Sequence, residues 1–336
     1  MSYPRQFTFG NPSPFSVFIM SSSVSVPTHK TALVIHGGAG VMSRSSMSAE
    51  TEAAYLASLN AALNAGNAIL QQGGTARAAV IASILVLEDC PLFNAGNGSV
   101  FNAEGGHELD ASIMEGHTSK AGAVAGVRTI KNPILLAEAV MEHSSHVMLA
   151  IDGAEAFADT QPDIVRVAPD YFDSVHRLEQ LHKTQAEERI SASQDLKGKY
   201  FGTVGAVALD VNGHIAAGTS TGGMTNKRWS RIGDSPIIGA GTFANEQCGV
   251  SGTGWGEFFI RAVVAHDICA RVKYRGDSIS AAAEEVLLKV VPEMGGDGGA
   301  IALDKDGNIS LPFNTEGMYR GWVKPDGSRG VAIFKD

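Results

Sequence analysis

The chain has 336 residues, 44% of them hydrophobic, so it is long enough to bury one large core or two ordinary ones. Its formal net charge is −9 and it has no block of basic residues, which argues against a surface that binds nucleic acid or an anionic membrane. Three cysteines, Cys90, Cys248 and Cys269, form no CxxC pair, and we expect reduced thiols in a cytoplasmic protein.

Residues 1–30 are rich in serine and proline, and their apolar run FSVFIM is too short for a signal peptide or a membrane span. We expect a disordered extension here. The folded part is predicted to begin with a buried strand over 32–35 that runs into a glycine turn over 37–40, in the motif HGGAG. Two helices that cover a sheet are predicted next, over 49–71 and 75–88.

Two strands and three helices are predicted for the middle of the chain. The strands are expected over 109–114 and within AGAVAGV at 121–127. Asn132-Pro133 is typical of a helix start, and the helices are expected over 133–142, 152–159 and 173–188. A polar segment over 184–201 is predicted to be a mobile linker.

The last part of the chain contains two predicted hairpins. The first has strands over 203–209 and 214–218 around the turn Asn212-Gly213, and the second turns at Asp306-Gly307. Between them we expect two short strands within 237–253 and helices over 257–274 and 279–291, and a final strand is expected over 330–334. This order predicts two sheets packed face to face and covered by helices.

The Gly202-Thr203 peptide lies between the polar linker and the first hairpin, which is a favourable place for chain cleavage. Cleavage there would give Thr203 a free α-amino group with a pKa near ~7.7–8.0, within reach of its own hydroxyl. That amine could serve as the base that a threonine nucleophile needs. Because other Gly-Thr pairs occur in the chain, the pair alone is also compatible with an ordinary turn.

Competing motifs point to other chemistry. The run from Gly218 to Gly222 fits GxSxG, with Ser220 as an esterase nucleophile and His266 as its base, but no helix is predicted to follow it. Glycines 252, 254 and 256 form a weak dinucleotide motif without the expected acidic residue. Cys90 lies beside acidic residues, which would raise the pKa of its thiol and disfavour a nucleophilic role.

Two further segments could bind an amino acid. Arg231 and Asp234 lie in a Gly/Pro-bounded loop, where an arginine fork and a carboxylate suit an α-carboxylate and an α-ammonium group, although a surface ion pair is the alternative. Thr253 and Gly254 lie in a glycine-rich turn that opens a helix, so their backbone could hold an oxyanion or simply cap the helix. The ten histidines show no spacing typical of a metal site.

Eight ordered motifs together resemble the plant-type L-asparaginase/isoaspartyl peptidase family of N-terminal nucleophile (Ntn) hydrolases, over about residues 31–336. They are HGGAG (36–40), LEDCPLFNAGNGSVF (87–101), HELDASIMEG (107–116), GTVGAVALD (202–210), TSTGGMTNK (219–227), RIGDSPIIGAG (231–241), SGTGWGE (251–257) and LPFNTEGMYR (311–320). The resemblance implies an α/β fold of the four-layer αββα sandwich type. It also implies autoproteolysis between Gly202 and Thr203 into an α fragment (31–202 after the extension) and a β fragment (203–336), assembled as (αβ)2.

The resemblance further implies hydrolysis of β-aspartyl peptides and L-asparagine, with Thr203 as the nucleophile. It assigns supporting, oxyanion and substrate-binding roles to other residues: Thr221, Thr219, Thr253, Gly254, Gly256, Arg231, Asp234 and Asn94. No catalytic cofactor is implied, but a structural sodium ion is, held mainly by backbone carbonyls of Leu87, Glu88, Cys90, Phe93, Ala95 and Asn97.

The chain departs from the usual family pattern at two places near the expected pocket. Lys227-Arg228-Trp229-Ser230 replaces a typical KLPG, and Trp255 stands where Thr or His is more usual. The preference between asparagine and isoaspartyl peptides therefore stays open. A glycosylasparaginase-like enzyme and an uncleaved, catalytically silent homologue remain the alternatives.

Overall fold

The structure, a computed structural model, describes residues 30–40, 44–190 and 202–335, together with Met1. Up to residue 190 its elements are β1 (Ala32–Gly40), η1 (Arg44–Ser46), α1 (Ala49–Gln71), α2 (Ala76–Glu88), η2 (Gly96–Gly98), β2 (Leu109–Glu115), β3 (Ala121–Val127), α3 (Pro133–His143), β4 (Met148–Ala150), α4 (Ile151–Ala158), η3 (Pro169–Phe172) and α5 (Val175–Ile190). After residue 202 they are β5 (Val204–Leu209), β6 (Ile215–Thr221), β7 (Thr242–Ala244), β8 (Cys248–Gly254), α6 (Gly256–Ala262), α7 (Val264–Ala270), η4 (Arg271–Arg275), α8 (Ile279–Glu285), η5 (Val286–Val290), α9 (Val291–Glu293), β9 (Gly298–Asp304), β10 (Ile309–Ser310), β11 (Gly317–Val323) and β12 (Arg329–Phe334).

The larger sheet has eight strands in the order β12, β11, β1, β5, β6, β2, β3 and β4. Strand β1 lies between β11 and β5, and β2 lies beside β6, so strands from before and after residue 202 alternate in its centre. The register aligns His36, Gly205, Thr219 and Ser112 in one row across β1, β5, β6 and β2. This row becomes important at the functional site.

A smaller sheet has the order β10, β9, β8 and β7, with antiparallel neighbours throughout. Alternation along the strands creates three apolar cores, because successive side chains point to opposite faces of a sheet. Leu33 and Ile35 of β1 face helices α1 to α3, whereas Ala32 and Val34 face the smaller sheet. The far side of the smaller sheet packs Val250 and its neighbours against α6, α7 and α8.

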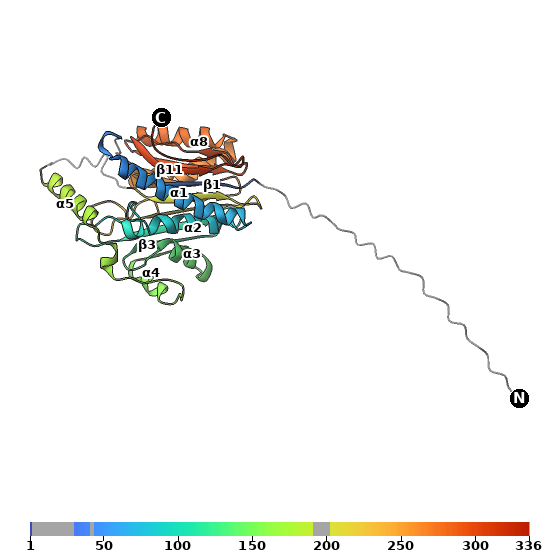
Figure 1. The fold of residues 1–336 in the computed structure, drawn as a ribbon, viewed down its shortest axis with the longest axis horizontal. Helices are drawn as coiled ribbons and strands as arrows, with labels where there is room; N and C mark the ends of the chain where they lie inside the picture. The colour runs from blue at the N-terminus through green and yellow to red at the C-terminus, as the bar shows by residue number, and fades with distance from the viewer. Residues whose placement is uncertain (2–29, 41–43, 191–201, 336) are drawn as a thin grey trace.

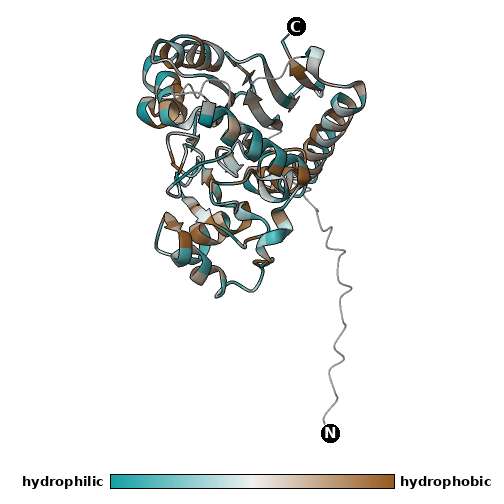
Figure 2. Ribbon diagram, turned by 90° about the vertical axis from the view of Figure 1, so that its left-hand side faces the viewer, coloured by the Kyte–Doolittle hydropathy of each residue, from teal (hydrophilic) through white to brown (hydrophobic). Residues whose placement is uncertain are grey.

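The helices cover the outer faces of the sheets as the apolar pattern predicts. Figure 1 shows α8 near one end of the molecule and α3 and α4 near the other, with α1 and α2 between them. Figure 2 shows hydrophobic (brown) and hydrophilic (teal) residues within the same helices, since one face of a helix packs on a sheet and the other meets water. Ser48 and Thr75 begin α1 and α2 by accepting hydrogen bonds from backbone N–H groups three residues ahead.

Most predicted elements are confirmed, but two differ. Strand β1 does not end in a turn at Gly37; it continues to Gly40 with an irregularity between His36 and Gly38. The helix predicted over 257–274 is broken at Val263, whose φ of 49° lies in the left-handed region. Strands β4 and β11 have no counterpart in the prediction.

The predicted linker over 184–201 is also partly wrong, because α5 remains helical to Ile190. Residues 191–201 and the predicted N-terminal extension, apart from Met1 and Lys30, lie outside the described residues. Among the described residues, no helix combines the length and the apolar character that a membrane crossing requires.

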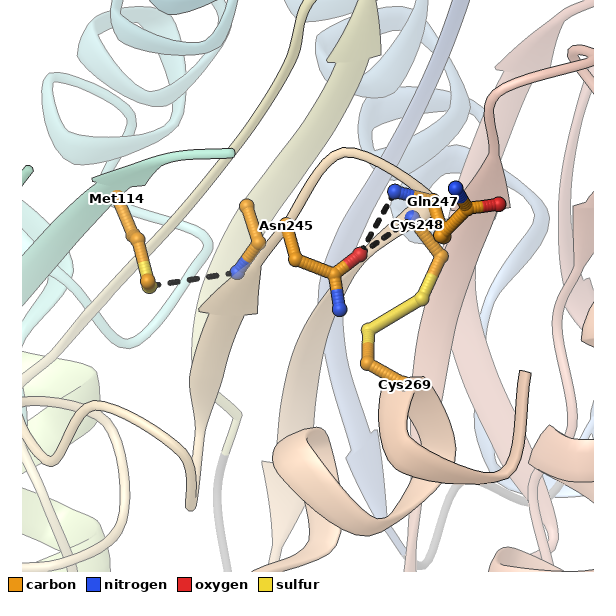
Figure 3. Close-up of a disulfide and its surroundings, with 6 residues drawn as sticks. Met114, Asn245, Gln247, Cys248 and Cys269 are labelled. Carbon is orange, nitrogen blue, oxygen red and sulfur yellow. Dashed lines mark hydrogen bonds between the residues drawn. A yellow bond between two sulfur atoms is a disulfide. The ribbon is translucent and has the colours of Figure 1, made fainter. Parts of the chain in front are cut away.

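The expectation of three reduced thiols is wrong for two of the cysteines. Figure 3 shows Cys248 of β8 joined in a disulfide to Cys269 of α7. The Cα atoms of the two residues are 6.0 Å apart. Sequence spacing could not reveal this pair, because the contact forms only when α7 packs on the smaller sheet. Cys90 is a free, half-buried thiol.

Candidate active site

The start of β5 and the end of β6 bring two threonine hydroxyls together. Val204 pairs with Ser220, so Thr203 comes to lie beside Thr221. The Thr203 hydroxyl donates a hydrogen bond to Thr221 Oγ1 at 3.1 Å, and both side chains are buried. The sequence analysis linked these two residues only through the family resemblance, and the structure places them in direct contact.

The carbonyl group of Gly202 is held by two side chains. Asn94 Nδ2 donates to this oxygen at 2.9 Å, and the Thr221 hydroxyl lies 3.4 Å from it. Asn94 is itself fixed, because its Oδ1 accepts from the backbone N–H of Val100 at 2.9 Å. Donors that are already oriented toward a carbonyl oxygen can stabilise the negative charge that develops there during nucleophilic attack.

Gly38 explains part of the HGGAG motif. Its φ is +112°, and a Cβ at this position would lie 2.4 Å from the Cα of Gly202. Only glycine allows this backbone conformation together with such a close approach. The next residue, Ala39, donates its N–H to Thr253 Oγ1 at 3.1 Å, so β1 connects the scissile segment to β8.

A charged group lies at the other side of the pocket that Thr203 lines. Arg231 Nε and Nη2 donate to the two carboxylate oxygens of Glu257, at 2.8 and 2.7 Å. Asp234 is 5% exposed, and burial raises its pKa to about 6, although the neighbouring Arg231 acts in the opposite direction. Asp234 Oδ2 is buried and accepts no hydrogen bond from the described residues, which is unusual for a buried carboxylate oxygen.

Two glycines of the SGTGWG motif leave room for these groups. A Cβ at Gly256, the first residue of α6, would lie 2.7 Å from Arg231 Nη2 and 2.9 Å from Asp234 Oδ1. Gly254 has a φ of +154° and passes close to the backbone of residues 297 and 298. Thr253 and Gly254 line the same pocket as Thr203, Arg231 and Asp234.

Thr219 lies beneath this pocket and does not line it. It belongs to a buried chain of hydroxyl groups in which Ser251 bonds both His36 Nε2 (2.9 Å) and Thr219 (2.7 Å). Thr242 donates to Thr219 and accepts from Ser112 at 2.8 Å. Gly205 makes the chain possible, because a Cβ there would lie 2.0 Å from Ser251 Oγ. Burial lowers the pKa of His36 to about 3, so its imidazole is neutral.

The predicted sodium loop follows α2 as a compact turn. Gly96 and Gly98 let carbonyl groups converge, since a Cβ at either one would lie 2.4 Å or less from a backbone carbonyl of Glu88 or Phe93. The carbonyl groups at the C-terminal end of α2 also carry partial negative charge. Backbone oxygens in such a turn fit a hard cation, whereas the described residues contain no cluster of three His, Cys, Asp or Glu side chains.

The esterase alternative is wrong. The Ser220 hydroxyl donates to the buried Glu88 carboxylate at 2.6 Å, and the ring of His266 packs edge-on against Phe243. Neither Ser220 nor His266 lines the pocket. The dinucleotide alternative also lacks its structural context, because Gly252 and Gly254 belong to strand β8.

Sequence reasoning missed two functional contacts. Glu257 pairs with Arg231, and the signal for this pair in the sequence is an acidic residue in the first turn of a helix that follows a segment with two arginines. The close approach of Gly38 to Gly202 had no sequence signal beyond the glycine itself.

Comparison with known proteins identifies the family of the chain. A family model described as asparaginase matches residues 29–333. The isoaspartyl peptidase of Escherichia coli is 50% identical over 313 residues, covering 91% of this chain and 97% of the relative. The isoaspartyl peptidase of Salmonella typhimurium is 48% identical (92% and 100% covered), and a plant-type L-asparaginase of Pyrobaculum calidifontis is 40% identical (88% and 97% covered). The chain therefore belongs to the asparaginase family that these matches define.

Proposed function

We propose that this chain is a threonine hydrolase that activates itself by cleavage before Thr203 and then hydrolyses β-aspartyl (isoaspartyl) peptides and L-asparagine to release L-aspartate. One observation carries the proposal. The Thr203 hydroxyl contacts Thr221 beside the Gly202 carbonyl, in a pocket that also contains Arg231 and Asp234. The relatives named isoaspartyl peptidase and L-asparaginase support the choice of substrate.

In the precursor, Thr203 Oγ1 attacks the carbonyl carbon of Gly202. Asn94 Nδ2 stabilises the oxyanion, since it already donates to that oxygen. The C–N bond breaks, the amine of Thr203 takes up the proton that its hydroxyl group has lost, and an ester joins Gly202 to the threonine side chain. Water then hydrolyses this ester, which leaves a carboxylate on Gly202 and a free amine on Thr203.

In the mature enzyme the same hydroxyl attacks a second substrate. Arg231 binds the α-carboxylate of the aspartyl group with the N–H donors that Glu257 leaves free, and Asp234 binds its α-ammonium group. These two contacts present the side-chain carbonyl carbon to Thr203. The free amine of Thr203 accepts the proton of the hydroxyl as the C–O bond forms.

Thr253 and Gly254 would stabilise the oxyanion of this second reaction, because they line the pocket beside Thr203. The amine then donates its proton to the leaving nitrogen, and ammonia or an amino acid departs. Water hydrolyses the β-aspartyl ester and releases aspartate. Thr219, which has no exposed surface, would act by holding β6 in place and not by touching substrate.

The two fragments, ending at Gly202 and beginning at Thr203, would form a four-layer αββα sandwich of the Ntn-hydrolase type and assemble as (αβ)2 in the cytoplasm. The two stacked sheets with helices on their outer faces support this architecture. We also propose a structural sodium ion in the loop over 87–97. A higher melting temperature in sodium chloride than in choline chloride would support the ion, and equal melting temperatures would contradict it.

Intact mass and N-terminal sequencing after incubation at neutral pH test the proposed cleavage. We expect two fragments, the smaller one beginning Thr203-Val204-Gly205, and hydrolysis of both L-asparagine and β-Asp-Leu. Thr203→Ala should stay uncut and inactive while it keeps the melting temperature of the precursor. An uncut but active Thr203→Ala variant would contradict the assignment of the nucleophile.

A further inference from the structure

A second cavity meets the Thr203 pocket at Gly202. It has a volume of about 840 Å³, counting its open mouth, and lies between β1, α1, α5 and the loop over 92–94. The two spaces share only Ala39 and Gly202, and neither Arg231 nor Asp234 lines the second one. We call it the Arg177 cavity, after the charged residue in its wall.

Arg177 is a buried cation without a carboxylate partner among the described residues. It is 5% exposed, and its Nε, Nη1 and Nη2 atoms donate to Gly98 O (2.8 Å), Gln180 Oε1 (3.0 Å) and Leu92 O (3.2 Å). A guanidinium group has five N–H donors, so two remain after these bonds. Burial lowers the pKa of Arg177, because the charged form of the guanidinium group loses contact with water.

Two other cations of the described residues are paired with carboxylates. The buried Lys227 lies close to the carboxylate of Glu108, and the partly buried Arg231 makes a two-pronged ion pair with Glu257. A buried charge is normally balanced in this way. At Arg177 the balancing anion is missing from the described residues, and the cavity in front of it can admit one.

Three aromatic side chains form one part of the cavity wall. Tyr55 stacks on Tyr319 with ring centroids 4.2 Å apart, and Phe93 packs edge-on against both rings. A space with an aromatic patch, polar groups and one unbalanced cation suits an amphipathic anion, such as an amino acid or short peptide with a free carboxylate.

The proposed reaction releases such a molecule as its leaving group, so this inference depends on the proposed function. The amine of Thr203 must reach the leaving nitrogen in order to protonate it. That amine is the atom to which Gly202 is bonded before cleavage. The leaving group therefore departs from the place that Gly202 occupies, and Gly202 lines the Arg177 cavity.

We propose that the Arg177 cavity is the leaving-group site for β-aspartyl peptides, with Arg177 binding the carboxylate of the released amino acid or short peptide. L-asparagine releases only ammonia and has no group to place there. Arg177 therefore determines how well peptides are cleaved relative to asparagine, without touching the aspartyl half of the substrate.

The test compares five substrates: L-asparagine, and β-Asp-Leu and β-Asp-Gly-Leu each as the free acid and as the C-terminal amide. The variants are Arg177→Met, which removes the charge, and Arg177→Lys, which keeps it. Arg166→Met is the matched control, because Arg166 is paired at the surface with Glu155 and Asp159. Intact mass must first show that each variant is cleaved.

For at least one of the two peptides, the wild-type kcat/KM should be about tenfold or more higher for the free acid than for the amide. This is the effect expected from one hydrogen bond to a charged group. Arg177→Met should abolish this preference and change asparagine hydrolysis by less than about threefold, with Arg177→Lys between the two. An acid-to-amide ratio unaffected by Arg177→Met would overturn the inference. So would an equal loss on asparagine and on the acids, which indicates that Arg177 only supports the loop over 92–98.

A measurement on the wild type alone covers the case in which Arg177→Met does not fold. L-leucine should inhibit asparagine hydrolysis more strongly than L-leucinamide, and equal inhibition by both would contradict the inference. A wild type that hydrolyses neither asparagine nor peptides refutes the proposed function instead, so the two failures are distinguishable.

Discussion

Replacing Gly38 with alanine should block self-cleavage while leaving the fold intact. The new Cβ would lie 2.4 Å from the Cα of Gly202, whereas ordinary contacts begin at 3.4 Å, so the two segments must separate by at least 1 Å. Such a movement pulls the Gly202 carbonyl away from Asn94 Nδ2, now 2.9 Å distant. A 1 Å misplacement or the loss of one oxyanion donor each reduces rates by about 100-fold or more.

Gly73 provides the matched control for this substitution. Its φ is also positive, at +77°, but a Cβ there would meet no atom within 4 Å. Gly73→Ala therefore includes the backbone strain, about 1–3 kcal/mol, without the contact at Gly202. We expect it to lower the melting temperature by several degrees and to be cleaved at the normal rate.

The assay is intact mass spectrometry at timed intervals after rapid purification, with Thr203→Ala as the uncut standard. Gly38→Ala should remain largely uncut over a period in which the wild type and Gly73→Ala are converted completely. Cleavage of Gly38→Ala at the wild-type rate would refute the reasoning, and so would an equal delay in Gly73→Ala.

Three further predictions concern the substrate pocket and the buried hydroxyls. Because the pKa of Asp234 is raised to about 6 and only its ionised form attracts an ammonium group, kcat/KM for asparagine should fall more steeply below pH 6, by about tenfold per pH unit beyond the fall that protonation of the Thr203 amine causes; a slope that does not steepen between pH 6 and pH 5 would contradict this. Asp234→Asn should reduce kcat/KM and abolish this additional fall, with cleavage still visible by mass. Thr219→Val leaves buried partners without a hydrogen bond and should cost about 1–3 kcal/mol in unfolding free energy, whereas Thr160→Val at the surface should cost almost nothing; urea unfolding of both measures the difference.

The local pattern predicted most helices because their caps and apolar spacing are encoded nearby. α1 occupies the predicted range, since Ser48 caps its start and its leucines face the sheet. The break at Val263 could not be predicted, because a left-handed valine is tolerated only through tertiary contacts. Strand β11 was missed because Arg320 and Trp322 interrupt its apolar pattern, although its hairpin with β12 across the turn at Asp326-Gly327 was a local signal.

The residue types of the site could be predicted from the sequence, but which residues line the pocket and which lie beneath it could not. Residue chemistry suggested Thr203, Arg231 and Asp234, and the structure brings all three into one pocket. The place of Thr219 beneath that pocket depends on the register of four strands and on the insertion of Ser251 from the other sheet. The sequence of a single segment does not contain this information.

The alternating strand order has a consequence for the cut protein. A break before Thr203 should leave the two fragments associated, because β1 stays hydrogen-bonded between β5 and β11 and β2 stays bonded to β6. Neither fragment can leave without breaking the middle of the larger sheet, whereas the smaller sheet belongs entirely to the fragment that begins at Thr203. The nicked protein should therefore melt in one cooperative step, like a single chain, and its separated halves should not find their way back by simple mixing.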